Sequence, residues 1–232
     1  MSSKPRHINT NLYYHVFNCG VEKRTVYLSR YDYNRFLETL SYYTRDQRLG
    51  YAHFLLLKPE DKSLYILANE ITQERSARVK IIAYCLMPNH FHLLIKPVRS
   101  EGVAAFVADV SNSYTRYFNL KYNRIGSLLQ GTFKATEVDS GESFLQVSRY
   151  IHLNPIRSYY TNPDGKIRKP EDYPYSSYSE WVQPENNSLC DGPEIGKILG
   201  TSPKRENSYR EFVEGSLHKN PAIGIESFLF EV

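Results

Sequence analysis

Two apolar runs separated by two turn-forming residues constrain the fold of this chain more than any other feature. Residues 79–87 read VKIIAYCLM, residues 90–97 read HFHLLIKP, and Pro88 and Asn89 lie between them. Runs rich in β-branched and aromatic residues favour strands, and a Pro-Asn pair favours a tight turn. The sequence therefore predicts a β-hairpin in the core of the molecule.

The rest of the chain mixes strands and helices without strict alternation. Helical spacing of apolar residues is strongest in residues 100–122, where one stripe repeats at i, i+3, i+4 and i+7. Such a mixture predicts an α+β fold, with an antiparallel sheet covered by helices on one face. Further strands are predicted at 11–20, 51–57 and 132–138, helices at 31–47, 100–122 and 140–155, a loop or short helix at 58–78, and an irregular segment at 161–187.

The charged residues are unevenly distributed. Residues 1–160 hold 21 Lys and Arg against 13 Asp and Glu, a net charge of +8. Residues 161–232 hold 8 against 12, a net charge of −4. A basic body suits a polyanionic partner, although an ordinary solvated surface would give the same count.

The cysteines and the apolar residues bear on the compartment. Cys19, Cys85 and Cys190 are widely spaced and odd in number, which argues against a disulfide framework and against a cysteine metal site. No run of apolar residues is long enough to suggest a membrane-spanning helix. The first residues lack the apolar core of a signal peptide, so we expect a cytoplasmic protein.

Two histidines lie two residues apart on the second strand of the predicted hairpin. Side chains at i and i+2 of a strand point to the same face, so His90 and His92 project together while Phe91 points to the other face. Two imidazoles held side by side on a sheet can bind a divalent metal. Alternatively, both are core histidines satisfied by hydrogen bonds, and a third ligand would decide between these hypotheses.

The predicted helix at 140–155 offers such a ligand. Tyr150 and Asn154 are four residues apart and therefore lie on nearly one face of the helix. If this helix packs beside the histidine strand, Asn154 can give an oxygen to the metal and Tyr150 can attack a bound molecule. The alternatives are that Asn154 and Pro155 simply end the helix, and that Tyr150 is one of 20 ordinary tyrosines.

The chemistry of this group would suit a phosphodiester. A tyrosine hydroxyl has a pKa of about 10 and is a poor nucleophile at neutral pH unless a cation polarises the target phosphate. Two imidazoles and an amide oxygen leave positions open for phosphate oxygens and suit Mn²⁺ or Mg²⁺. The product, a phosphotyrosine ester, keeps the bond energy for rejoining to another strand.

At these residues the sequence resembles the single-tyrosine HUH transposases, and it is most similar to their REP-associated tyrosine transposase branch. The resemblance covers roughly residues 10–180. Its most specific part is MPNHFHLL followed by RYIHLNP. Supporting segments are FNCGVEKRTVYLSRYDYNRF, AYCLMPNHFHLLIKP, SYTRYFNLKYNRIGSLLQGTFKA and SRYIHLNPIRS.

The resemblance implies a ferredoxin-like antiparallel sheet over residues 1–160, which would form the nuclease and transposase domain, with a C-terminal extension over 161–232. It implies that single-stranded DNA beside hairpins, which are imperfect palindromes, is cut and joined through a 5′-phosphotyrosine link with Mg²⁺ or Mn²⁺. By position, Tyr150 would be the nucleophile and His90, His92 and Asn154 the metal ligands. Many relatives have Gln in place of Asn154 and Arg in place of Thr132.

The DNA contacts are less determined by the motifs. Candidates for phosphate contacts near the cleft are Arg116, Arg124, Lys134 and Arg149, each of which is otherwise a solvated surface charge. Tyr114 and Tyr117 lie on the apolar stripe and are assigned to the core. The long C-terminal segment favours a monomer over a dimer.

Three other functions compete with this one. A DNA-hairpin-binding regulator would keep the fold and lose catalysis, but all four expected site residues are present. A structural zinc site would add His152 to His90 and His92, although His152 lies about 200° around the helix from Tyr150 at 100° per residue. A replication initiator or relaxase would share the histidine pair, but the chain is small for one.

Overall fold

The centre of the molecule is a four-stranded antiparallel sheet. The computed structural model describes residues 8–71, 76–139, 141–157, 167–184, 188–200 and 205–217. Its strand order is β2-β3-β1-β4, so the first strand lies between the third and the fourth. The strands are β1 (Tyr13–Cys19), β2 (Val79–Met87), β3 (His90–Pro97) and β4 (Lys134–Val138).

The predicted hairpin is confirmed. Met87 pairs with His90 across the two-residue turn, and the ladder continues to Val79 and Pro97. Nearly every residue of both strands is buried. Strands that are apolar along their whole length require cover on both faces, because each face would otherwise expose apolar side chains to water.

One face is covered by the two helices that connect the strands. Helix α1 (Arg30–Tyr43) follows β1 and begins with a capping box between Ser29 and Asp32. Helix α5 (Gly102–Lys121) follows β3 and buries most of the stripe predicted from its spacing, including Phe106 and Tyr114, whereas Tyr117, which the sequence assigned to the core, is only partly buried. The resulting β-α-β-β-α-β order with this strand arrangement is ferredoxin-like, so the α+β class is confirmed.

The prediction of a strand at 51–57 is wrong. That segment forms helix α2 (Tyr51–Leu56), and helix α3 (Pro59–Ile71) follows it. Periodicity alone cannot distinguish a short apolar run in a strand from one in a helix. Here the run is not a buried strand, because Leu55 and Leu56 are exposed on a short helix beside α1 and α5.

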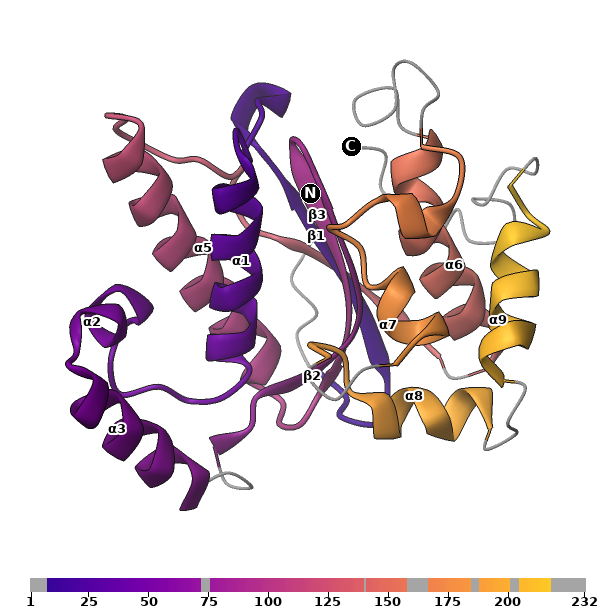
Figure 1. The fold of residues 1–232 in the computed structure, drawn as a ribbon, viewed down its shortest axis with the longest axis horizontal. Coiled ribbons are helices and arrows are strands. Elements are labelled where there is room, and N and C mark those ends of the chain that lie inside the picture. Colours follow the sequence, from indigo (N-terminus) through magenta and orange to yellow (C-terminus); the bar gives the residue numbers. More distant parts are fainter. Residues whose placement is uncertain are drawn as a thin grey trace.

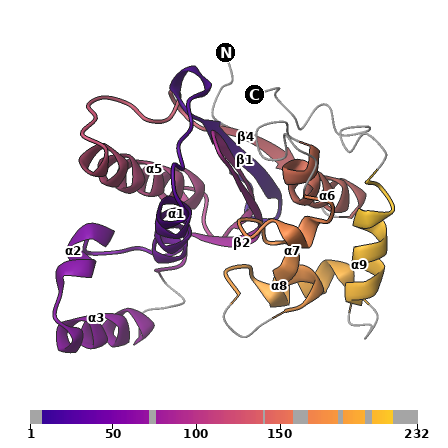
Figure 2. The same ribbon diagram turned by 45° about the horizontal axis from the view of Figure 1, so that its top comes forward.

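Helices cover the second face as well, where the sequence led us to expect cover on one face alone (Figures 1 and 2). Helix α6 (Glu142–Arg157) packs on this face, and it continues through Pro155 although we expected it to end near Asn154. On the same side are α7 (Tyr178–Val182) and α8 (Gly192–Leu199) beside β2, and α9 (Arg205–Glu214), which packs on α6 and α7. Short 3₁₀ turns occur at Val21–Lys23 and Pro170–Asp172.

The C-terminal segment also bonds to the outer edge of the sheet. The backbone of Leu86 donates to the carbonyl of Tyr175 at 2.9 Å, and Ser177 donates to the carbonyl of Tyr84 at 3.0 Å. The Trp181 indole donates to the carbonyl of Ile82 at 2.9 Å. Residues 175–182 therefore shield the outer edge of β2. The expected boundary at residue 160 lies outside the described residues.

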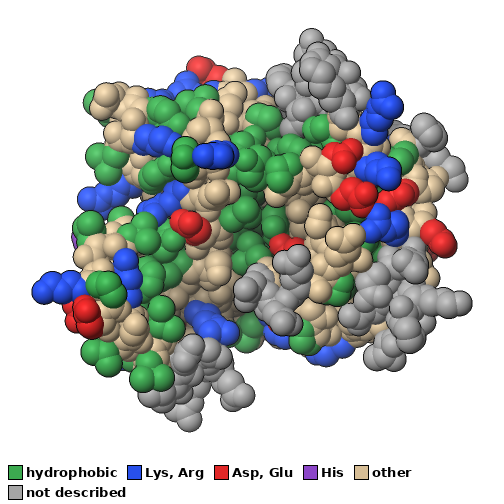
Figure 3. Space-filling view, in the orientation of Figure 1, with side chains coloured by type: hydrophobic (Ala, Val, Ile, Leu, Met, Phe, Trp, Pro, Cys, Tyr) green, Lys and Arg blue, Asp and Glu red, His purple; other side chains and the backbone are tan. Residues whose placement is uncertain are grey.

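The surface reflects the uneven charge of the sequence. Figure 3 shows a mixed cluster of acidic and basic side chains over the half that carries α6, α7 and α9. Within it, Arg210 forms ion pairs with Glu171 and Glu214. None of the described helices combines the length and the apolar character that a membrane span needs.

Candidate active site

The two histidines of β3 lie side by side on the face of the sheet that α6 covers. His90 and His92 are 9% and 2% exposed, and their ring centroids are 4.9 Å apart with the rings nearly perpendicular. This placement follows from the two-residue period of a strand. The prediction that both imidazoles share one face is confirmed.

Hydrogen bonds hold one nitrogen of each ring. The Oδ1 of Asn89 lies 2.6 Å from Nδ1 of His90, so a carbonyl oxygen accepts the Nδ1 proton and Nε2 keeps its lone pair. Nδ1 of His92 lies 3.0 Å from Nε2 of His15. If His92 donates in that bond, its Nε2 also keeps a lone pair. Metal-binding histidines in proteins are commonly oriented in this way.

Both imidazoles are held in the neutral form. Burial lowers the pKa of His90 to about 4. Burial, assisted by the neighbouring imidazoles of His90 and His15, holds the pKa of His92 well below its ordinary value. Neutral imidazole is the form that binds a metal ion.

His15 is a member of this group that the sequence interpretation missed. It lies on β1, where Phe17 pairs with His92, and its ring stacks on that of His92 with a centroid distance of 5.1 Å. The one sequence feature that pointed to His15 was its position in a predicted strand. Its position beside His92 depends on the register between β1 and β3, which the sequence does not display.

Helix α6 places Tyr150 against these imidazoles. The Tyr150 ring meets the ring of His92 edge-on at 5.5 Å and that of His15 at 6.1 Å. Burial raises the pKa of Tyr150, and the Asn154 side chain beside the hydroxyl acts in the opposite direction. The two helix residues share one face, as their four-residue spacing predicts.

The side chains present fit a divalent metal. Within the described part of the chain, no three His, Cys, Asp or Glu side chains form a metal-binding group, so a third protein ligand for the histidine pair would have to be a residue of another type, for which Asn154 is the candidate. Its Nδ2 is buried and has no hydrogen-bond partner among the described residues. Two neutral imidazoles and an amide oxygen are a donor set that suits Mn²⁺ or Mg²⁺.

The four candidate DNA-contact residues are dispersed. Lys134 lies opposite Phe17 on β4, and its ammonium is 5.6 Å from the Phe17 ring, on the histidine face of the sheet. Arg149 turns away toward the C-terminal segment, where its guanidinium contacts Phe212 and donates to Ser216. Arg124 lies in the loop after α5 and donates to Asn119 of that helix. Arg116 is on α5, across the sheet from α6.

His152 is a core residue with both nitrogens engaged. Its Nδ1 lies 2.7 Å from the hydroxyl of Tyr209, and its Nε2 lies 2.9 Å from Oγ of Ser177. Burial lowers its pKa to about 3. A zinc site built from His90, His92 and His152 is therefore contradicted.

Comparisons with known proteins bear on the family and the fold of this chain. Residues 51–154 match the family model described as "Transposase IS200 like". A search of curated protein sequences found no significant match. A solved structure of a REP-associated tyrosine transposase bound to a REP hairpin is 13% identical, covers 84% of this chain and 93% of its own, and superposes with a TM-score of 0.51.

A second solved structure, described as a "putative transposase" from Deinococcus radiodurans R1, is 15% identical, with coverage of 65% of this chain and 95% of its own. Its TM-score is 0.30, which is too low to support a shared fold. The first structure, at its low identity, supports the fold alone. The matched segment 51–154 contains both histidines of β3 and the tyrosine and asparagine of α6. Over that segment the chain is similar to the IS200-like transposases, which is the resemblance that its sequence motifs indicated.

Proposed function

We propose that this protein cuts and joins single-stranded DNA beside hairpins, with Tyr150 as the nucleophile. The observation that carries the proposal is the packing of the Tyr150 ring against His92 and His15, with His90 alongside. A tyrosine of α6 and a neutral histidine pair of β3 therefore meet at one place, and Asn154 lies one turn along the same helix. The related solved structure holds a REP DNA hairpin, which supports a hairpin as the substrate here.

In the cutting step, the Tyr150 oxygen forms a bond to a backbone phosphorus and the bond from that phosphorus to the 3′ oxygen breaks. The phenol loses its proton and the departing 3′ oxygen gains one, which leaves a 3′ hydroxyl and a 5′-phosphotyrosine. In the joining step, a 3′ hydroxyl from another strand displaces the tyrosine by the reverse reaction. No outside energy source is needed, because one phosphoester replaces another.

The surroundings of Tyr150 keep it protonated until DNA is in place. Burial raises its pKa, so at neutral pH the resting side chain is a phenol. The amide of Asn154 favours the phenolate and partly offsets burial. A Mg²⁺ or Mn²⁺ ion held by His90, His92 and Asn154 would supply the positive charge that polarises the target phosphate. Lys134 lies on the same face and would contact the DNA backbone.

The C-terminal segment acts as a brace for the tyrosine helix. His152 of α6 bonds to Ser177 and Tyr209, and Arg149 donates to Ser216. We assign catalysis to residues 1–160 and this support to residues 161–232. Since α6 lies on its own chain's histidines and is covered by its own chain, one subunit holds a complete site, which favours a monomer. The three free cysteines suit the reducing cytoplasm.

The test is the formation of a covalent protein–DNA adduct. Labelled hairpin oligonucleotides from the DNA flanking the gene are incubated with protein and Mn²⁺, or with chelator, and resolved on a denaturing gel. We expect a metal-dependent adduct that Tyr150→Phe abolishes and that Tyr31→Phe, an exposed tyrosine elsewhere on the surface, leaves intact. Hairpin binding without adduct in every condition would replace this proposal with a non-catalytic hairpin-binding regulator.

A further inference from the structure

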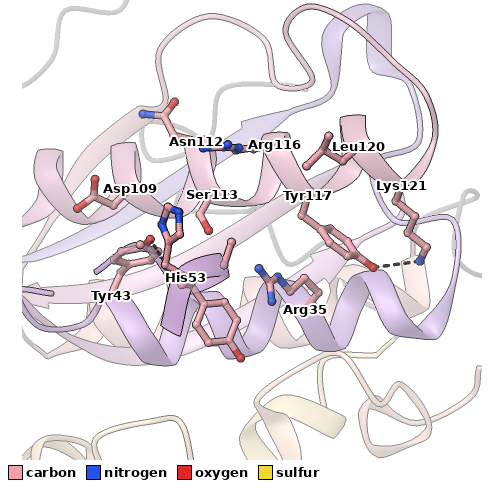
Figure 4. Close-up of a pocket in the computed structure, with 13 residues that line it drawn as sticks. Arg35, Tyr43, His53, Asp109, Asn112, Ser113, Arg116, Tyr117, Leu120 and Lys121 are labelled. Atoms are coloured by element: carbon pink, nitrogen blue, oxygen red, sulfur yellow. Dashed lines mark hydrogen bonds between the residues drawn. The ribbon is translucent and has the colours of Figure 1, made fainter. Parts of the chain in front are cut away.

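A cavity lies on the opposite face of the sheet from Tyr150. It has a volume of about 550 Å³ and is lined by residues of α1, α2 and α5. Figure 4 shows Asn112, Arg116 and Leu120 along one side of α5, with Arg35 reaching into the same space from α1. Proteins bind nucleotide-sized molecules in cavities of about 300–1,000 Å³. The chemistry proposed at Tyr150 makes no use of this space.

The cavity carries an excess of positive charge. Its carboxylate, Asp109, is neutralised by the guanidinium of Arg78 at 2.6 Å, and its ammonium, Lys121, is paired with Asp32 at 2.6 Å. Among the residues that the structure describes, no carboxylate forms an ion pair with Arg35 or Arg116. Two guanidinium groups without counter-ions therefore line one cavity, which favours an anion as its ligand.

The Arg35 side chain shows that the cavity is built rather than incidental. Its guanidinium lies over the ring of Tyr51 at 4.2 Å and over that of Tyr117 at 5.2 Å. Its Nε is buried and has no hydrogen-bond partner among the described residues. Leaving a buried charged donor unpaired is costly, so a ligand that accepts from this side chain would be stabilised.

The remaining wall is apolar and aromatic, with a few polar groups. Tyr43, Tyr51, Tyr117 and Leu120 present carbon surface, while Asn112 and Ser113 present hydrogen-bonding groups. An inorganic anion would use the guanidinium groups and leave this wall without contacts. A planar ring joined to a phosphate would use both, since aromatic side chains stack on bases and an amide can pair with a base edge.

We propose that this cavity binds a nucleoside phosphate, with the phosphate at Arg116 and Arg35 and the base against the aromatic wall. The ligand is either a free nucleotide or an unpaired nucleotide of a DNA strand, because the two share this chemistry. The inference goes beyond the proposed cutting reaction and does not depend on it.

Calorimetric titration of the full chain tests the proposal. The probes are deoxyadenosine 5′-monophosphate, inorganic phosphate and a single-stranded oligonucleotide, the last with Tyr150→Phe protein so that no strand is cut. Arg116 is exposed, so Arg116→Ala should fold, and Arg30→Ala removes an equal charge from an exposed site outside the cavity. We expect Arg116→Ala to weaken binding about tenfold or more, as loss of a charge-assisted hydrogen bond does, and Arg30→Ala to have little effect.

The two sources give different results. A tenfold loss with the mononucleotide identifies a free nucleotide, and a loss seen with the oligonucleotide alone identifies DNA. Equal affinities for the two arginine variants with every probe would overturn the proposal, as would equal affinities for inorganic phosphate and the mononucleotide. A wild-type protein that binds the mononucleotide but forms no covalent adduct would refute the cutting reaction and leave this inference standing.

Discussion

His15 is predicted to set the metal affinity of the candidate site although it is not itself a proposed ligand. Its Nε2 is the hydrogen-bond partner of His92 Nδ1 at 3.0 Å. His15→Phe removes that partner while keeping a flat ring of similar size in the stack on His92. His92 is 2% exposed, so water cannot readily take the place of the lost nitrogen.

The size of the effect follows from the burial of His92. A buried N–H left without a partner costs about 1–3 kcal/mol. Loss of an outer hydrogen bond to a metal-binding histidine typically weakens metal binding about 10–100-fold, which corresponds to about 1.4–2.7 kcal/mol. The two figures agree, so we expect the Mn²⁺ concentration at half-saturation to rise about 10–100-fold.

The assay is calorimetric Mn²⁺ binding, followed by the rate of covalent adduct formation at each metal concentration. His15→Gln, which can again accept from His92, should recover part of the affinity. His53→Gln removes an exposed histidine from α2 on the other side of the molecule and should bind metal as the wild type does.

A thermal melt in chelator separates a positioning role from a purely structural one. If His15→Phe lowers the melting temperature but leaves the Mn²⁺ midpoint unchanged, the assignment of His15 as a positioning residue is refuted. If the midpoint rises while stability in chelator is nearly unchanged, the assignment is supported.

Two further predictions concern stability. Burial alone would raise the pKa of Glu194, but hydrogen bonds from Lys96, Lys197 and Tyr13 outweigh it and lower that pKa to about 2. A carboxyl whose pKa is lowered on folding stabilises the fold above pH 4.5, its ordinary pKa, and this stabilisation is lost as the pH falls toward 2. Between pH 5.5 and pH 3.5 the free energy of unfolding in urea should therefore fall by about 1.3 kcal/mol more in the wild type than in Glu194→Gln. Equal losses would contradict this. A Cβ on Gly102 would lie 2.3 Å from the Arg78 carbonyl oxygen, whereas one on Gly192 meets nothing. The free energy of unfolding of Gly102→Ala should therefore be lower than that of the wild type by about 1–3 kcal/mol. Gly192→Ala is the control, and equal stability of the two variants would show that the backbone shifts to relieve this contact.

The sequence was informative where a pattern is local. The hairpin and the long helix were predictable because their burial follows a period of two or of 3.6 along the chain. The shared faces of His90 with His92, and of Tyr150 with Asn154, followed from the same periods. Neither period predicts that α6 packs on the histidines. The motif on α6 was identified by its resemblance to a known family.

The features that could not be predicted from the sequence depend on contacts between distant segments of the chain. The place of His15 needed the register of two strands separated by more than sixty residues in the chain. Arg149 read as a surface charge beside the tyrosine, yet α9 and the residues after it engage its side chain. The cavity between α1 and α5 arises because residues 51–56 form a helix where a strand was predicted.

The central place of β1 in the sheet has a consequence for the boundaries of any fragment of this protein. The segment that matches the family model, residues 51–154, begins after β1 in the sequence, yet β1 is the strand that joins β3 to β4. A fragment with those boundaries would lack the strand between β3 and β4, so one edge of each of these two strands would be left unpaired. It would hold every side chain proposed to do chemistry and lack the strand that brings them into alignment. A fragment that keeps the sheet intact must therefore begin before β1 and be longer than the matched segment.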